Sequence, residues 1–276
     1  MHTSFDLSAV GDLRPLADVS RTVSDTAAGI VERWLIIGAT ARDLILRYVH
    51  GLAQSRKTVD LDIAVGVASW EVFARLEKEL IANGATPVRG VAHAFLLRDW
   101  KIDVIPFGGV EENGVIVWPP ANDHAMSVVG FTEASENAME VILPGQVRVL
   151  VASPAGLLIL KLIAWKERHW SYPRYDAVDI RTLLVSYSES WNEDRLYDEA
   201  GELLRRFQFD NTLAGAALLG RDAAAIAKPV TLQRIQAILE TETAEDAMTL
   251  AADMGFRTED NLKLLEALLF GIRDAR

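Results

Sequence analysis

The sequence has no cysteine and no long hydrophobic run, and each absence excludes a class of protein. Without cysteine, the 276-residue chain forms no disulfide and no zinc or iron–sulfur site built on thiolates. The longest apolar stretches, residues 149–152 and 156–160, are far too short to span a bilayer. The N-terminus lacks the basic and apolar pattern of a signal peptide. We therefore expect a cytoplasmic protein with no membrane partner.

Basic residues are also scarce. The chain has 28 Lys and Arg against 39 Asp and Glu, a net charge of −11. This balance argues against broad, non-specific nucleic-acid binding, because such binding depends on a cationic surface that neutralises phosphates. An acidic chain can still carry a local basic groove, so the net charge does not exclude RNA as a substrate.

The first half of the sequence alternates between strand-like and helix-like patterns. Short apolar runs that end in turn residues indicate strands, and apolar residues at helical spacing indicate helices. The expected elements are a helical lead-in over 1–33, a strand over 34–38, a helix over 39–48, a strand over 58–65, a helix over 70–82, strands over 94–97 and 101–107, and further short strands over 115–151.

From Ser153-Pro154 onward the pattern is helical to the end of the sequence. Ser153 suits an N-cap, and Pro154 suits the first helical position. We expect an α/β domain over residues 1–150 with a mixed sheet flanked by helices. A helical domain over residues 151–276 would follow and would contribute to the active site.

Two aspartates stand two residues apart on the strand expected over 58–65. Asp60 and Asp62 therefore project from one face, and their negative charges repel each other. A divalent cation relieves this repulsion, and Mg²⁺ prefers carboxylate oxygens together with substrate phosphates. The alternative is a pair of solvated aspartates on the wet face of an edge strand.

A third acid, Asp103, lies between apolar residues of the strand expected over 101–107. A carboxylate in such surroundings needs a cation or a hydrogen-bond donor. If this strand lies beside the strand of Asp60, Asp103 supplies a third metal ligand. It could also accept the proton of an attacking hydroxyl.

Small residues occupy the expected strand-to-helix turn, Gly38-Ala-Thr-Ala-Arg-Asp43. They allow backbone N–H groups at Gly38 and Ala39 and the hydroxyl of Thr40 to approach a phosphate, with Arg42 nearby as a cation. The alternative is a tight turn in which Gly38 serves only to reverse the chain.

The turn at Gly38, the paired aspartates and the later single acid form a pattern that resembles the nucleotidyltransferase superfamily. In that superfamily a Gly-Gly or Gly-Ser turn is followed by a helix, an Asp-x-Asp strand and a third acid on a neighbouring strand. Gly38-Ala39 stands at the Gly-Gly position. Ala41-Arg42-Asp43 is also similar to the head of CCA-adding enzymes. The resemblance implies a nucleotidyltransferase-like mixed sheet and Mg²⁺ bound by Asp60, Asp62 and Asp103.

A second set of charged residues lies on the first two helices after residue 153. Lys161 and Arg168 are two turns apart and share a helix face, which Lys166 does not join, and Asp176 and Asp179 share a face of the next helix. A lysine in an apolar helix needs an anionic partner, and a triphosphate is a good one, so Lys161 and Lys166 are candidate nucleotide-binding residues. The alternative is that the two helices pack together and pair these charges with each other.

Four aromatic residues lie near the same two helices. Aromatic side chains can stack a nucleobase, although at this spacing they more often belong to a core. We interpret Trp165 as a core residue and leave Trp170, Tyr172 and Tyr175 open.

The basic helix followed by Asp-x-x-Asp resembles the AbiEii-type toxin nucleotidyltransferases of bacterial toxin–antitoxin pairs, and with the first motif the likeness covers residues 34–185. It implies that Lys161 contacts the triphosphate and that Asp176 or Asp179 orients catalytic groups. Tyr175 stands where this family often has lysine.

These patterns predict transfer of a nucleotide from an NTP to a hydroxyl, with pyrophosphate leaving and two Mg²⁺ ions held by the three aspartates. RNA or tRNA is the expected acceptor, in a toxin-like enzyme with an antitoxin protein as possible partner. Two alternatives stay open. The acceptor is a small molecule such as an aminoglycoside, or the chain is a non-catalytic nucleotide-binding module, which the departures at Ala39 and Tyr175 would fit.

Overall fold

The computed structural model describes residues 4–52, 60–119, 125–190, 192–245 and 247–275. The chain divides into two compact units, one of Met1–Leu44 with Gln54–Ser153 and the other of Ile45–Ala53 with Pro154–Arg276. The division thus falls after Ser153, whereas the sequence analysis placed it at residue 150. The second unit also takes a short segment after Leu44, which the sequence pattern did not indicate.

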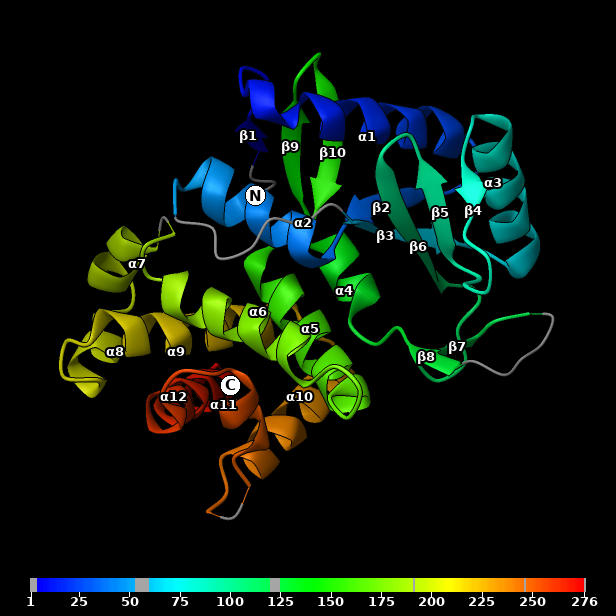
Figure 1. Ribbon diagram of the computed structural model, residues 1–276. Helices are drawn as coiled ribbons and strands as arrows, with labels where there is room; N and C mark the ends of the chain where they lie inside the picture. The colour runs from blue at the N-terminus through cyan, green and yellow to red at the C-terminus, as the bar shows by residue number, and fades with distance from the viewer. Residues whose placement is uncertain (1–3, 53–59, 120–124, 191, 246, 276) are drawn as a thin grey trace. The chain divides into compact units, whose positions relative to one another are not determined.

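The first unit is built on a mixed sheet of eight strands (Figure 1). The strand order is β1-β9-β10-β2-β3-β6-β5-β4, with β3 parallel to β6 and antiparallel to β2. The strands of this sheet are β1 (Ser4–Asp6), β2 (Arg33–Ile36), β3 (Asp60–Val67), β4 (Thr86–Pro87), β5 (Ala94–Leu97), β6 (Trp100–Gly108), β9 (Met139–Leu143) and β10 (Val147–Val151). The expected α/β unit with a large mixed sheet flanked by helices is therefore observed.

Helices flank this sheet, and a small second sheet accompanies it. Helix α3 begins after Ser69, whose hydroxyl accepts a hydrogen bond from the Val72 N–H as an N-cap. Helix α4 packs on β2 and β6, and its Phe131 ring contacts Phe107 of β6 with the ring centroids 6.1 Å apart. The remaining bounds are η1 (Gly11–Leu13), α1 (Arg14–Ala27), α2 (Gly38–Asp43), η2 (Leu44–Val49), α3 (Trp70–Ala82), β7 (Val115–Val117), β8 (Ala125–Ser127) and α4 (Phe131–Glu136).

Three short elements differ from the sequence expectations. Ser4–Asp6 is a strand inside the expected helical lead-in, Thr86–Pro87 adds an edge strand, and Phe131–Glu136 is a helix where only strands were expected. Each has six residues or fewer, which is too short to show a hydrophobic period. The first two residues of the strand expected over 58–65 lie outside the described residues.

The second unit is helical, as the pattern after Ser153 indicated. Trp165 is fully buried and its indole N–H donates to Asp253 Oδ2 at 2.9 Å, which confirms the interpretation of Trp165 as a core residue. No helix among the described residues has both the length and the apolar character needed to cross a membrane. The helices are α5 (Pro154–Arg168), α6 (Pro173–Ser186), α7 (Glu193–Asp198), α8 (Gly201–Arg206), α9 (Asn211–Ile226), α10 (Pro229–Glu242), α11 (Thr249–Asp253) and α12 (Thr258–Asp274).

Candidate functional site

The three predicted aspartates lie on one face of two adjacent strands. In the parallel pair β3–β6, Asp62 is the register partner of Asp103, and Asp60 is the partner of Lys101. Register partners on neighbouring strands present their side chains on the same face, and so do residues two apart on one strand. Leu61 points to the opposite face and is fully buried. The sheet therefore puts the side chains of Asp60, Asp62 and Asp103 on one face.

The turn at Gly38 lies against the paired aspartates. The Ile37 N–H donates to the Asp62 carbonyl at 2.9 Å, which joins the end of β2 to β3. Gly38 has a φ of +66°, a left-handed conformation that favours glycine. A Cβ atom at Gly38 would lie 2.1 Å from Asp62 Oδ2, so the missing side chain also leaves the room that the Asp62 carboxylate occupies. Glycine is needed here both for the turn and for the position of Asp62.

The other predicted residues of this turn have structural partners. The buried Thr40 hydroxyl donates to the Asp60 carbonyl at 2.8 Å, so it fixes the start of β3. Arg42 is buried and its guanidinium binds Asp43 Oδ1 at 2.6 Å. Ala39 is half-buried. The structure thus gives Thr40 and Arg42 protein partners, and phosphate binding at Gly38, Ala39, Thr40 and Arg42 stays a prediction.

Asp103 is paired with a lysine that the sequence analysis did not single out. The Lys101 ammonium donates to Asp103 Oδ2 at 2.8 Å. The other oxygen, Asp103 Oδ1, is buried and has no hydrogen-bond partner among the residues that the structure describes. The sequence could have indicated this ion pair, because Lys101 and Asp103 are two residues apart on one strand and such residues share a face.

The Lys101 ammonium interacts electrostatically with all three aspartates. Partial burial alone would lower the pKa of its ammonium, but the hydrogen bond to Asp103 and the negative charges of Asp103, Asp60 and Asp62 outweigh burial and raise the pKa. Lys101 therefore stays protonated at neutral pH and acts as the protein's own counter-ion to this group of carboxylates.

Within the described ranges, no group of three or more His, Cys, Asp or Glu side chains lies close enough to hold a metal ion. The expected three-carboxylate metal site is thus not formed within these ranges, and Asp103 is paired with Lys101. Two features nevertheless fit a divalent cation. The donor set consists of carboxylate oxygens on one face of the sheet, and one of these oxygens, Asp103 Oδ1, is buried without a partner.

The second predicted motif forms a charge cluster between two helices of the helical unit. The Lys161 ammonium on α5 binds Asp176 Oδ1 at 2.9 Å and Asp179 Oδ2 at 2.7 Å, both on α6. Arg168, also on α5, binds the same Asp176 through two nitrogens, at 2.7 and 2.8 Å. Lys161 and Arg168 thus share a helix face, and so do Asp176 and Asp179. This is the interhelical pairing that the sequence analysis kept as the alternative to triphosphate contact.

The Asp176 carboxylate is fully buried between these two cations. Burial would raise its pKa, but the hydrogen bonds from Arg168 and the charges of Lys161 and Arg168 outweigh burial, and the pKa is lowered. Burial likewise acts to lower the pKa of Lys161, and the charges of Asp179 and Asp176 raise it instead. Asp176 and Lys161 are therefore both charged at neutral pH.

Exposed aromatic and basic side chains gather at the turn between α5 and α6. Trp170 is 80% exposed, and Tyr172 and Tyr175 are each more than half exposed, with their two rings edge to face at 5.8 Å. Lys166, Arg168 and Arg174 lie on the same stretch and are exposed. We call these six residues the aromatic–basic surface. The sequence left its three aromatics open, and the structure places them in solvent.

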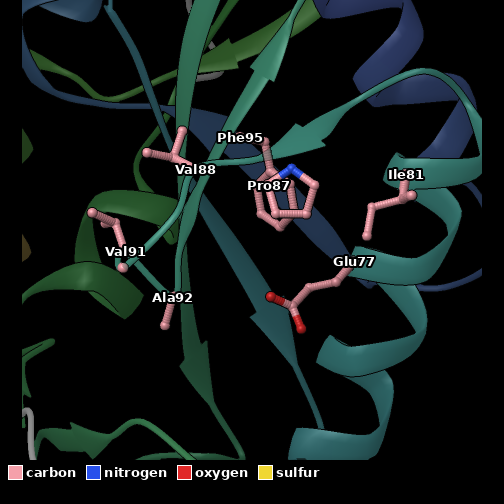
Figure 2. Close-up of a pocket in the computed structure, with 8 residues that line it drawn as sticks. Glu77, Ile81, Pro87, Val88, Val91, Ala92 and Phe95 are labelled. Atoms are coloured by element: carbon pink, nitrogen blue, oxygen red, sulfur yellow. The ribbon is translucent and has the colours of Figure 1, made fainter.

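A shallow hollow of about 430 Å³ lies between α3 and the β4–β5 hairpin. Figure 2 shows Glu77 and Ile81 of α3 facing Pro87 and Phe95 across it. Phe95 is the register partner of Ile102, so it is on the sheet face opposite to Asp103. The hollow is therefore separate from the aspartates. Partial burial raises the pKa of Glu77.

Comparison with known proteins gives a distant likeness to a solved structure. None of the protein-family models matches this sequence, and no curated protein matches it. The fold is similar to that of the antibiotic-resistance factor ANT(2'')-Ia, whose structure was solved in solution. The two have 13% sequence identity, and the match covers 70% of this chain and 97% of that chain with a TM-score of 0.40. The function proposed below therefore rests on this chain's own residues.

Proposed function

We propose that this protein is a nucleotidyltransferase that moves a nucleoside monophosphate from an NTP to a hydroxyl acceptor. One observation carries the proposal. Asp62 and Asp103 are register partners on parallel strands, Asp60 shares their face, and the Gly38 turn lies against Asp62. Carboxylates concentrated on one face in this way are suited to bind divalent cations together with a polyphosphate.

In this proposal Asp60, Asp62 and Asp103 hold Mg²⁺, two ions once the NTP is bound. When bound, the metal would neutralise charge on the attacking and leaving oxygens of the phosphoryl group. Gly38 keeps the Asp62 carboxylate in place, and Thr40 fixes the backbone at Asp60. Asp103 would in addition accept the proton of the attacking hydroxyl, which its partly buried carboxylate can do once Lys101 has moved away.

The helical unit supports RNA, including tRNA, as the acceptor. Its aromatic–basic surface offers exposed rings on which unpaired bases can stack, with cations beside them for the phosphates. This surface supplies the local positive charge that an acidic chain needs to bind nucleic acid. Lys161 and Lys166 remain the candidate nucleotide-binding residues of this unit, and Asp176 and Asp179 hold the Lys161 ammonium at 2.9 and 2.7 Å.

The proposal extends to a toxin-like role. Modification of RNA would arrest the growth of cells that express the chain, and a cognate antitoxin protein would relieve the arrest. A small-molecule acceptor such as an aminoglycoside would give drug resistance without growth arrest. A non-catalytic nucleotide-binding module would give neither.

The test is transfer of label from α-³²P NTPs, tried one at a time with total RNA and Mg²⁺. We expect one nucleotide to label RNA with release of pyrophosphate, and EDTA to stop the reaction. Replacing both Trp170 and Tyr172 by alanine should raise the RNA concentration needed for half-maximal labelling by roughly thirtyfold or more, since each stacked base contributes about 1–3 kcal/mol. NTP binding without pyrophosphate release would reject the enzyme and favour the binding module.

A further inference from the structure

The face of the sheet that carries Asp60, Asp62 and Asp103 also carries a cation, Lys101. Lys101 Nζ is 2.8 Å from Asp103 Oδ2, and Lys101 is the register partner of Asp60. A lysine there relieves the repulsion among three carboxylates that share one face. A divalent cation bound to the same carboxylates would do the same, so the two cations serve one set of ligands.

A metal bound to Asp103 would lie close to the Lys101 ammonium. Oδ2 is taken by the ammonium, while Oδ1 is buried without a partner in the described part of the chain. A metal with two positive charges close to the Lys101 ammonium would be repelled by it. The Lys101 side chain is 38% exposed, so it has room to swing into solvent and release Asp103.

We propose that Lys101 is the resident counter-ion of the aspartate site and competes with the divalent cation for Asp103. Without metal, the Lys101 ammonium offsets the repulsion among the three carboxylates. Because a metal ion must displace this ammonium from Asp103, Lys101 raises the metal concentration at which the site is half occupied. This inference rests on the proposed function, because it concerns the same three carboxylates. It adds that Lys101 regulates how tightly these carboxylates bind the metal.

The test measures thermal unfolding of the full chain in EDTA and then over a series of Mg²⁺ and Mn²⁺ concentrations. Lys101→Met removes the charge and keeps the chain length. We expect this variant to melt lower than wild type in EDTA, since Asp103 loses its partner. It should also reach half of its metal-induced rise in melting temperature at a roughly tenfold lower metal concentration, because the repulsion is gone.

Three further variants separate this effect from others. Lys101→Arg keeps the charge and should behave like wild type, while Lys78→Met removes an exposed lysine from α3 and should not move the metal midpoint. Lys101→Gln keeps a donor for Asp103 and replaces Lys101→Met in the test if the latter does not fold. Asp103→Asn should weaken the metal response in every background.

Two outcomes overturn the proposal and are distinct from each other. If wild type responds to metal but Lys101→Met has the same midpoint or a higher one, Lys101 does not compete, and the proposed metal site stands without it. If neither protein responds to metal, the counter-ion proposal fails together with the proposed function.

Discussion

Asp62→Ala should lower the rate of label transfer from an α-³²P NTP by roughly a thousandfold or more. Asp62 is the central carboxylate of the site, since it faces Asp103 across the strand pair and shares its own strand with Asp60. Removing one group that stabilises charge in a transition state costs about 10²–10³ in rate, and loss of a metal ligand also weakens the ion's hold on the phosphates.

Asp60→Ala and Asp103→Ala should give losses of similar size. Asp99→Ala is the matched control, because Asp99 is an exposed acid at the turn before β6, in the same unit of the chain. Wild-type folding of the inactive variants is checked by circular dichroism. Full activity of Asp62→Ala would remove Asp62 from the reaction and reject the site as described.

Asp176→Ala should destabilise the helical unit by about 3–5 kcal/mol, the usual cost of removing one partner of a buried ion pair. The Asp176 side chain is fully buried and accepts hydrogen bonds from both Lys161 and Arg168. Without it, the Lys161 ammonium loses one of its two carboxylate partners in the described part of the chain and keeps Asp179. Denaturant unfolding at pH 7 measures the loss.

The stability that Asp176 contributes should depend on pH in a definite direction. Because the pKa of Asp176 is lowered in the folded protein, its stabilisation is present above the ordinary pKa of about 3.9. It is lost as the pH falls through the lowered value, so wild type and Asp176→Ala should converge in stability in strong acid. Asp198→Ala, at an exposed position of α7, is the control and should cost less than about 0.5 kcal/mol. An equal, small loss in both variants would show that the cluster contributes little.

The shared face of Asp60 and Asp62 was predictable because it depends on a period of two that the sequence displays. A residue two positions away on a strand shares a face, so Asp60-x-Asp62 could be placed without coordinates. The adjacency of the Asp103 strand was an expectation that only the sheet order could test, since pairing between distant segments leaves no local signal. The structure places β6 directly beside β3.

Side-chain partners were less predictable than strand positions. Thr40, Arg42 and Lys161 were each expected to meet phosphate, and each is hydrogen-bonded or ion-paired within the protein. A sequence shows that a buried charge needs a partner, but several partners satisfy the same need. Lys101 was overlooked for a related reason, because a lysine at the start of a strand usually extends into solvent.

Anomalous diffraction from Mn²⁺ in crystals grown with a non-hydrolysable NTP analogue tests the central claim most directly. The account predicts a manganese peak about 2.1 Å from carboxylate oxygens of Asp60, Asp62 and Asp103, with the Lys101 ammonium moved away from Asp103. Crystals that bind the nucleotide but show no manganese at these three residues, with Asp103 still held by Lys101, would contradict it.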